Sequence, residues 1–286
     1  MEYASEAEKW LQMAATESDK LITSGRYEIY NTGHPQEDYF NMYRIDDKSD
    51  LKEAVLYVDY KTNIREHNMA AAGREAGCGF SKSFVESFLC SDGLPISLSN
   101  KYLGDETMRK ETANRDPRLK QLILTNDFPT NVTDDLKDST FVVNEDEFIT
   151  QHCFTGYRPI KGFNPIYSQA LYMKSSFDGI AYRYAETLLI NAEAKAELNT
   201  ITNADLDRTV NQLRDRVGMP HLTVNVGFTD PKWPDWGYSL SPVLQEIRRE
   251  RCIELAGEGF RFNDLKRWKA GKLLNNVLTY VGKKKT

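Results

Sequence analysis

The sequence has few cysteines and few histidines, and neither type is grouped in a way that suits a metal ion. The cysteines are Cys78, Cys90, Cys153 and Cys252, and the histidines are His34, His67, His152 and His221. Zinc sites use Cys and His ligands at short, regular spacings, such as CxxC pairs. No CxxC pair occurs, so we expect no metal, no cofactor and free thiols, with a disulfide as the alternative.

The sequence also lacks a long apolar run. No stretch of about 18 apolar residues is present that would span a bilayer. The first residues, MEYASEAEKWLQ, contain neither the basic nor the apolar region of a signal peptide. Either the protein is cytoplasmic, or this chain lacks its natural beginning.

The sequence also has no excess of basic over acidic residues. The net charge is -5 and the pI is about 5.6, whereas binding to nucleic acid requires a clustered excess of Lys and Arg. We therefore expect no nucleic-acid partner. With 286 residues, 40% of them hydrophobic, the chain can bury a sizeable core as one large domain or two small ones.

Residues 1–25 predict a helix that a neighbouring helix approaches closely. Small and apolar residues recur at steps of three and four: Ala4, Ala7, Leu11, Ala14, Ala15, Ser18 and Leu21. Small side chains on one face allow close helix packing. The sequence SGRY, residues 24–27, ends this helix.

Residues 26–179 are rich in Gly, Pro, Asn and Asp and contain only short apolar runs. We expect short strands at 54–60 and 121–126 and a short helix at 80–89. The remainder predicts long ordered loops, which often form binding surfaces.

Helical periodicity returns at residues 181–199. The predicted inner face carries Ala181, Tyr184, Ala185, Leu188, Leu189, Ala192 and Ala196, and the outer face carries Arg183, Glu186, Glu193 and Glu197. A second helix, capped by Asn203, continues to Gly218. Two such helices form the hairpin of tetratricopeptide-like arrays, although an ordinary helical bundle fits the periodicity equally well.

The most highly charged stretch is EIRRERCIELAGEGFRFNDLKRWKAG, residues 246–271. Its first helix begins at Ser239 or Ser241 before Pro242 and ends at Gly257. On a helical wheel, Arg251 and Glu254 lie within the apolar stripe, whereas Arg248 and Arg249 point elsewhere. Because buried charges must be paired, we predict that Arg251 and Glu254, which are three residues apart and neighbours on the helix surface, pair with each other in a buried ion network.

A second short helix begins near Asn263 and ends at Gly271, with Asp264 at its positive end. Phe260, Phe262 and Trp268 are interpreted as core anchors, with a ligand platform as the alternative. Glu250, Glu254 and Asp264 could also form the carboxylate set of a glycoside hydrolase. A nearby Arg would keep each acid ionised and make it a poor proton donor, so we expect no catalytic residue.

Several motifs together resemble the SusD/RagB family of nutrient-binding outer-membrane lipoproteins. The motifs are SKSFVESFLCSDGLPIS, NRDPRL, TGYRPIKGF, RYAETLLINAEAKAELN, LRDRVGMP and the charged stretch 246–271. The resemblance implies a mainly α fold with long ordered loops, a few short strands and tetratricopeptide-like hairpins. It further implies one SusD-like domain, residues 1–286, that is truncated at its N-terminus.

Within that domain, the resemblance divides the chain into three regions. Residues 1–25 form a helix of the helical array, residues 26–179 form a loop-rich region on the ligand side, and residues 180–275 form C-terminal helices that pack on the array. Structural roles are implied for Arg251, Glu254, Glu258, Arg261, Asp264 and Trp268.

The resemblance implies a binding protein rather than an enzyme. Family members are lipoproteins on the cell surface that hold an oligosaccharide or a peptide over a TonB-dependent (SusC-like) outer-membrane transporter and deliver it inward. The signal peptide and lipidated cysteine of the family are absent from this chain. Two alternatives remain: a helical scaffold that binds only the transporter, and a glycoside hydrolase.

Two loops offer the aromatic and polar side chains that bind sugars. The first loop contains Tyr60, Asn63, Arg65, His67 and Asn68, and its alternative interpretation is a polar surface loop. The second loop contains Trp233, Trp236 and Tyr238, which either contact a ligand or pack beneath the neighbouring helix.

Overall fold

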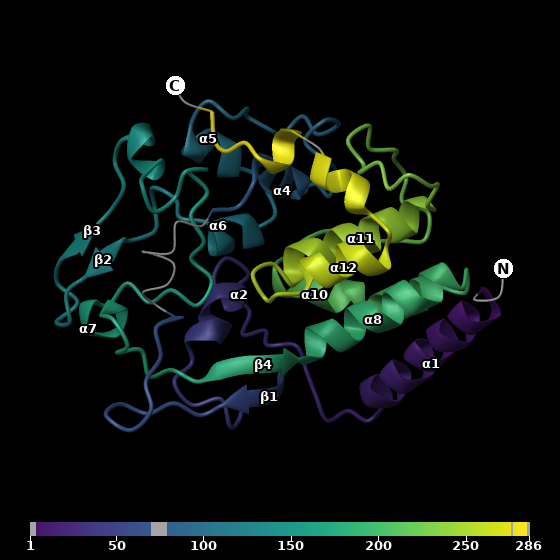
Figure 1. The fold of residues 1–286 in the computed structure, drawn as a ribbon, viewed down its shortest axis with the longest axis horizontal. Coiled ribbons are helices and arrows are strands. Elements are labelled where there is room, and N and C mark those ends of the chain that lie inside the picture. The colour runs from purple at the N-terminus through teal and green to yellow at the C-terminus, as the bar shows by residue number, and fades with distance from the viewer. Residues whose placement is uncertain (1–3, 70–78, 276, 285–286) are drawn as a thin grey trace.

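Three long helices form one end of the molecule. The computed structural model describes residues 4–69, 79–275 and 277–284, and in it α8 (Tyr184–Glu197) packs between α1 (Ala4–Thr23) and α11 (Pro242–Glu254) (Figure 1). The Asn191 amide on α8 donates hydrogen bonds to the Ala15 carbonyl and the Ser18 hydroxyl on α1, each at 3.0 Å. The predicted close packing of the first helix is therefore confirmed.

The predicted helix from Asn203 to Gly218 is two helices. α9 (Asn203–Asp207) and α10 (Val210–Arg216) are separated at Thr209, whose backbone is not helical and whose hydroxyl donates to the Asp205 carbonyl. The cap is Thr202, which forms a capping box with Asp205, and not Asn203. Gly218, with φ of +66°, ends the pair as predicted.

A two-stranded antiparallel sheet precedes α8. β1 (Ala54–Val58) pairs with β4 (Gly179–Arg183), with Ala54 opposite Arg183 and Val58 opposite Gly179. The strand predicted at 54–60 is confirmed, although it ends two residues earlier. The helix predicted from Ala181 begins instead at Tyr184, because β1 offers a partner for the backbone of residues 179–183.

The other end of the molecule is made of short elements joined by loops, as predicted for residues 26–179 (Figure 1). They are α2 (Asp38–Asn41), η1 (Met42–Arg44), α4 (Lys82–Ser87), α5 (Met108–Thr112), α6 (Arg118–Leu122), β2 (Asn131–Val132), β3 (Ser139–Thr140), η2 (Glu145–Phe148) and α7 (Tyr167–Ala170). The helix predicted at 80–89 is confirmed as the shorter α4, capped by Ser81. The fold is mainly α with few short strands, as expected.

The strand predicted at 121–126 is wrong. Gln121 and Leu122 belong to α6, which Pro117 precedes, and beyond α6 only Ile123 makes an isolated bridge, to Pro159. An apolar run this short fits a buried helix as well as a strand, so the pattern could not distinguish them.

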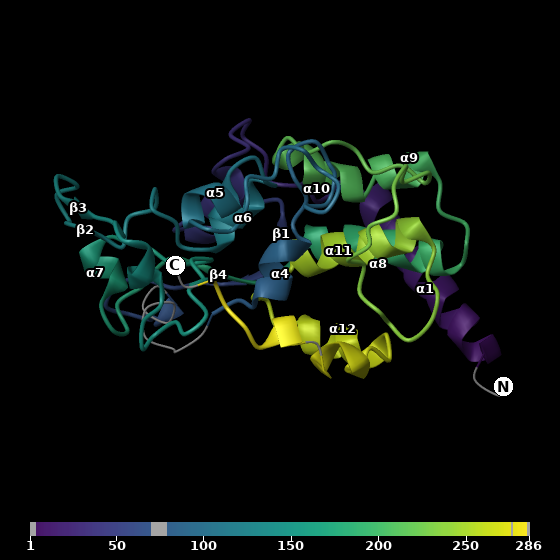
Figure 2. The same ribbon diagram turned by 90° about the horizontal axis from the view of Figure 1, so that it is seen from above.

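The chain after α11 turns onto one side of the helical end. α12 (Arg261–Arg267) is followed by η3 (Gly271–Asn275) and η4 (Val277–Thr279), and η4 packs on α4 (Figure 2). α12 ends at Arg267, four residues before the predicted Gly271. Lys283, in the last described segment, is buried and pairs with Glu145 at 2.9 Å.

Two apolar cores meet at α11. One core lies in the loop-rich end and includes Ile253 and Ala256, and the other lies among α8, α10 and α11 and includes Leu244 and Ile247. α11 therefore contributes side chains to both cores.

A buried ion network lies at this junction, centred on Glu254. The Glu254 carboxylate is fully buried and is bonded by three guanidinium groups, from Arg118 at 3.0 Å, Arg183 at 2.6 Å and Arg216 at 2.6 Å. These arginines come from α6, the end of β4 and α10. One carboxylate thus joins the loop-rich end to the helical end.

The remaining members of the network balance its charge. Glu53 contacts Arg183, Glu250 contacts Arg118 and Arg214, and Glu258 contacts Lys161. The complete set contains as many acids as bases: Glu53, Asp116, Glu250, Glu254 and Glu258 with Arg118, Lys161, Arg183, Arg214 and Arg216. Balanced pairing is what makes buried charges tolerable.

The predicted buried positions of Arg251 and Glu254 are confirmed, but the expected pairing between them is wrong. Arg251 extends over the Phe260 ring to Asp264 on α12, where its Nε lies 3.0 Å from Oδ2. Helical spacing shows that the two side chains are neighbours, but it does not show which distant partner each one reaches.

Four other expectations about side-chain exposure need correction. Arg183 and Glu193 were placed on an outer face, yet Arg183 belongs to the ion network and Glu193 accepts hydrogen bonds from Arg267 and Trp268. Arg248 is also buried, over the Trp268 ring. Phe262 is 66% exposed and is not a core anchor, whereas Trp268 is buried as expected.

Cys90 and Cys252 are free thiols, as expected. Cys153 is buried, and Cys78 lies outside the described residues.

The substitution Arg216→Ala tests the network. It leaves Glu254 and Glu53 without one buried partner, and we expect a loss of about 3–5 kcal/mol in the free energy of unfolding, measured by urea denaturation. Arg109→Ala is the matched control, because it removes an exposed pair with Asp127 and should cost less than about 1 kcal/mol. Equal losses in the two variants would contradict the network's role.

Acid should weaken the same network. Burial alone would raise the pKa of Glu258, but Arg183 and Lys161 outweigh burial and lower that pKa from 4.5 to about 2. Its contribution is fully present above pH 4.5 and is lost as the pH falls toward 2. The midpoint of urea unfolding should therefore decline as the pH falls from 4.5 to 2, and it should decline less steeply in the variant Glu258→Gln. The same pH dependence of the midpoint in both proteins would contradict a stabilising role of ionised Glu258.

Candidate functional site

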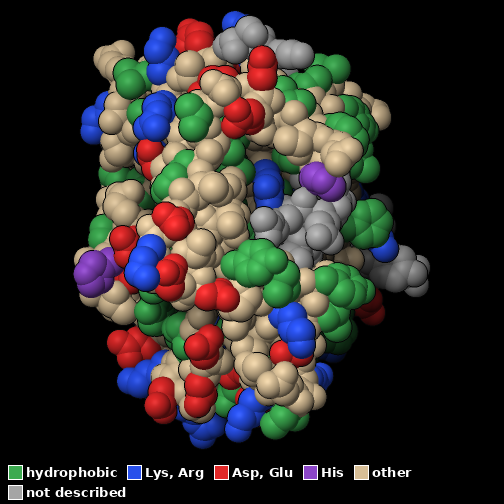
Figure 3. Space-filling model, turned by 90° about the vertical axis from the view of Figure 1, so that its left-hand side faces the viewer, with side chains coloured by type: hydrophobic (Ala, Val, Ile, Leu, Met, Phe, Trp, Pro, Cys, Tyr) green, Lys and Arg blue, Asp and Glu red, His purple; other side chains and the backbone are tan. Residues whose placement is uncertain are grey.

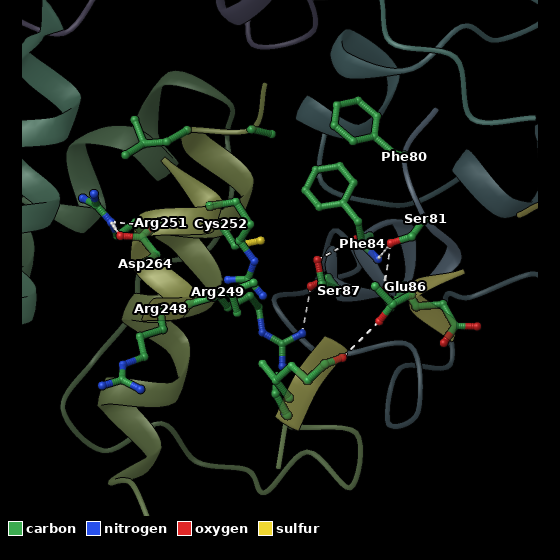
Figure 4. A pocket seen from close by; sticks show the side chains of 18 of the residues that line it. Phe80, Ser81, Phe84, Glu86, Ser87, Arg248, Arg249, Arg251, Cys252 and Asp264 are labelled. Atoms are coloured by element: carbon green, nitrogen blue, oxygen red, sulfur yellow. Dashed lines mark hydrogen bonds and ion pairs between the residues drawn. The ribbon is translucent and has the colours of Figure 1, made fainter. Parts of the chain in front are cut away.

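A cavity of about 980 Å³ between α4 and α11 is the candidate site (Figure 4). We call it the interhelical cavity. Its other walls are the loop 230–236, α12 and the segment around Leu273. α4 comes from an early part of the sequence and the other walls come from residues 230–279, so only the folded chain creates the cavity.

Aromatic rings form much of the wall. Phe80 and Phe84 stack on each other with ring centroids 4.5 Å apart, and Figure 4 shows them across the cavity from Cys252 on α11. The other aromatic lining residues are Trp233, Trp236, Phe260 and Phe262. Broad apolar ring faces of this kind bury the faces of flat or ring-shaped ligands.

Polar groups are fixed at the edge of this aromatic wall. The Arg249 guanidinium donates to the Ser87 carbonyl at 2.8 Å and to the Asp230 carboxylate at 2.6 Å. Glu86 pairs with Lys232 at 3.1 Å. Because its partners already orient Arg249, little side-chain entropy is lost when a ligand binds there.

The predicted second loop contributes to this cavity unequally. Trp233 is half-buried, and its indole N–H donates to Glu246 at 2.6 Å. Trp236 is only 4% exposed, donates to Gln245 at 2.6 Å and meets Trp268 edge-on. Both tryptophans line the cavity, whereas Tyr238 does not; its hydroxyl donates to the Trp268 carbonyl at 2.6 Å.

The predicted first loop lies away from the cavity, just after β1. Arg65 covers the Tyr60 ring at 5.0 Å, and Asn63 occupies a turn with φ of +62°. The Asn68 side chain accepts a hydrogen bond from the Met173 backbone at 3.1 Å. The His67 ring lies edge-on to the rings of both Tyr60 and Phe177. The two predicted loops therefore do not form one site.

Exposed aromatic residues lie beside the first loop, and the sequence did not predict them as part of a site. The first loop is bridged to the segment 167–178 through His67 and Ser175, and Tyr167 and Tyr172 of that segment are exposed, Tyr172 by 72%. Figure 3 shows hydrophobic side chains at the surface of this end of the molecule. The motif YSQALYM was the available signal, but without the bridge nothing connected it to Tyr60.

The acids of the charged stretch form ion pairs with basic side chains of the protein itself. Glu250 and Glu254 belong to the ion network, and Asp264 accepts hydrogen bonds from Arg251 and Arg267. Burial alone would raise the pKa of Glu254, but Arg216, Arg183 and Arg118 hold it well below its usual range. A carboxylate held ionised in this way is a poor proton donor to a leaving group, which argues against Glu254 as a general acid.

The residues of the charged stretch with implied structural roles make contacts within the protein. Arg251, Asp264 and Trp268 connect α11 to α12, Glu254 and Glu258 belong to the ion network, and Arg261 lies over the Trp268 ring. Among the described residues, no group of three possible ligands could hold a metal ion. No helix in the described ranges has the length and apolar character needed to cross a membrane.

Several solved structures have a similar fold. A SusD-like protein from Bacteroides fragilis has a TM-score of 0.66 at 24% identity, over 93% of this chain and 52% of its own. A SusD-like carbohydrate-binding protein from the same organism has a TM-score of 0.66 at 22% identity, over 94% of this chain and 50% of its own. Surface glycan-binding protein A from Bacteroides uniformis has a TM-score of 0.52 at 16% identity, over 99% of this chain and 53% of its own.

The chain spans about half the length of these solved relatives. At these identities the likeness concerns the fold. No curated protein sequence matches the chain. The sequence pattern of the SusD family, however, matches residues 21–286, nearly all of the chain, and confirms the resemblance seen in the motifs: this chain belongs to the SusD family.

Proposed function

We propose that the protein binds an oligosaccharide at the cell surface and delivers it to a TonB-dependent outer-membrane transporter, without catalysing a reaction. The observation that carries the proposal is the interhelical cavity, which combines aromatic walls with oriented polar groups. Family membership supports it, and so do two solved relatives, which are described as carbohydrate-binding and surface glycan-binding proteins.

The chemistry of the cavity suits sugars better than purely apolar ligands. A pyranose ring has C–H faces that pack on aromatic rings, such as those of Trp233 and Phe84, and hydroxyl groups at its edge that need hydrogen-bond partners. Asp230 and Glu86 supply acceptors, and Arg249 supplies a charged donor group. A purely apolar ligand would leave these groups without new partners.

The surface around Tyr60 is a second candidate for the ligand. Tyr60, Asn63, Arg65 and Asn68 lie near the exposed Tyr167 and Tyr172, so aromatic and polar side chains are again close together. Here, however, Arg65 already lies over the Tyr60 ring, and the Asn68 oxygen already accepts a backbone hydrogen bond. A ligand would have to displace these contacts, which favours the interhelical cavity.

Delivery to a transporter requires a membrane partner. In membranes of the native bacterium, the tagged full-length protein should co-purify with a large outer-membrane barrel protein. Co-purification that persists without any measurable binding to glycans would favour a scaffold that recognises only the transporter.

The substitution Trp233→Ala should weaken glycan binding at least about tenfold, which corresponds to about 1.4 kcal/mol, because it removes an aromatic wall held in place by Glu246. Binding is measured by calorimetry across a panel of polysaccharides and peptides. Tyr60→Ala is the matched control and should leave affinity unchanged. The reverse pattern, with Tyr60→Ala weakened and Trp233→Ala unchanged, would move the site to the first loop.

A ligand in the cavity should protect Cys252 from thiol reagents. Cys252 lines the cavity and is half-buried, whereas Cys90 and Cys153 are buried. In a Cys78→Ser background, we expect a maleimide to label Cys252 first, as identified by mass spectrometry, and a bound glycan to slow that labelling. Labelling at an unchanged rate in the presence of saturating glycan would place the ligand outside the cavity.

A further inference from the structure

The first loop is fastened to the segment 173–178 by hydrogen bonds. His67 and Ser175 form an antiparallel bridge, in which each backbone N–H donates to the carbonyl of the other residue, at 2.9 and 3.1 Å. The Asn68 side chain accepts from the Met173 backbone at 3.1 Å, although these two residues are more than a hundred positions apart in the sequence. We call these contacts, together with those of the His67 ring, the His67 clasp.

The His67 ring uses both of its nitrogens within the clasp. Nδ1 accepts a hydrogen bond from the Met69 backbone N–H at 3.0 Å, and Nε2 lies 2.8 Å from the Phe177 carbonyl oxygen. Because a carbonyl oxygen accepts and a backbone N–H donates, Nε2 carries the proton of the ring and Nδ1 carries none. The clasp therefore requires the neutral ring, in one tautomer.

A second proton on the ring is incompatible with this arrangement. It would attach to Nδ1, which would then point an N–H at the N–H of Met69. Histidine is the side chain whose ordinary pKa brings this change between pH 5 and 8. Uptake of the proton thus removes a hydrogen bond of the clasp and sets two donors against each other.

A buried cation beside the ring also opposes a second proton. Lys48 is buried, and its ammonium group donates to the Ile45 carbonyl at 2.6 Å. This ammonium group lies 5.7 Å from the centroid of the Phe177 ring, and the His67 ring lies 4.6 Å from the same centroid. Burial outweighs the nearby Asp178 and lowers the pKa of Lys48 to about 8. Lys48 therefore stays charged at the lower pH at which an imidazole takes up its proton.

The carboxylates around the ring are held by other partners. The Asp178 carboxylate accepts from the backbone N–H groups of Lys48 at 3.0 Å and Tyr60 at 2.8 Å. Glu66 pairs with the Lys174 ammonium group at 3.2 Å. The other charged side chains on these segments are exposed to water, which screens them: Asp46, Asp47, Asp59, Lys61 and Arg65. No carboxylate of the described residues forms an ion pair with the imidazole that would compensate for its charge.

We propose that the His67 clasp is a pH-sensitive switch, which holds the first loop on the segment 173–178 at neutral pH and releases it in acid. Release uncovers the ring of Phe177, which is fully buried, and that of Tyr60, which is half-buried. The inference does not rest on the proposed function, because it follows from the two partners of one imidazole ring.

The pH range of the switch follows from the sign of the pKa shift. Burial lowers the pKa of His67 from its ordinary 6.5; the Phe177 carbonyl opposes this effect, and the Lys48 cation adds to it. A lowered pKa means that the folded protein favours the neutral ring. The contribution of the clasp is therefore fully present above pH 6.5 and is lost as the pH falls below 6.5 and through the pKa of the folded protein.

Hydrogen exchange at pH 7.5 and pH 5.0, followed by mass spectrometry and corrected for the intrinsic pH dependence of exchange, tests the switch. Amides of residues 60–69 and 173–178 should exchange at least about threefold faster at pH 5.0, since each pH unit changes the ratio of protonated to neutral imidazole tenfold. Amides of α8 should keep their protection. Equal protection of the clasp at the two pH values would overturn the proposal.

His67→Gln separates the switch from a general loosening in acid. Its side-chain amide can donate to the Phe177 carbonyl and does not titrate in this range. We expect this variant to lose the acid response. His221→Gln is the matched control, because it changes an exposed histidine that bonds to Asp215, and it should respond to acid as the unaltered protein does. An acid response of the clasp that survives His67→Gln would overturn the proposal.

Lys48→Met supplies a second test if His67→Gln does not fold. It removes the cation that lowers the pKa of His67, so the midpoint of the acid response should move to higher pH, by about half a unit or more. A purely structural role of His67 predicts no such shift. A midpoint that stays in place or moves to lower pH would contradict the switch.

Discussion

The pairing of Glu254 with three arginines is the interaction on which the rest of this structure depends. Arg118, Arg183 and Arg216 come from α6, β4 and α10, and each ends at the same buried carboxylate of α11. Two apolar cores flank this point, and neither core alone contains all of these elements. A buried charge without its partner is strongly destabilising, so the network constrains how the loop-rich end sits on the helices. The walls of the interhelical cavity, α4 on one side and α11 on the other, are placed by that constraint.

Sequence reasoning predicted the helices well and their tertiary partners poorly. α1, α4, α8 and α11 follow from apolar periodicity and caps, which are local properties. β4 was missed because its partner β1 lies more than a hundred residues earlier, and α10 was merged with α9 because the break at Thr209 depends on side-chain hydrogen bonds. Burial of Arg251 and Glu254 was predictable from the helical wheel. Their partners were not, since no local pattern identifies Asp264 or Arg118.

In the candidate site, too, local clusters of residues were predictable and their tertiary partners were not. Trp233 and Trp236 were recognised as an aromatic cluster, and both line the interhelical cavity. Phe80 and Phe84 were recognised only as part of a short helix, because the surface they face comes from α11 and α12. The hydrogen bond from Trp233 to Glu246 links one residue of the charged stretch to the wall of the interhelical cavity. A stretch that is structural in most of its residues thus also positions an aromatic wall of the proposed binding site.

Hydrogen exchange of the Glu254→Gln variant, followed by mass spectrometry, tests the central claim most directly. If this carboxylate joins the two ends, amide exchange should accelerate in α6 and β1 as well as in α10, although these elements are far apart in sequence. Acceleration confined to α11 and its immediate neighbours along the chain would contradict the account, because it would show that the two ends are held together without the network.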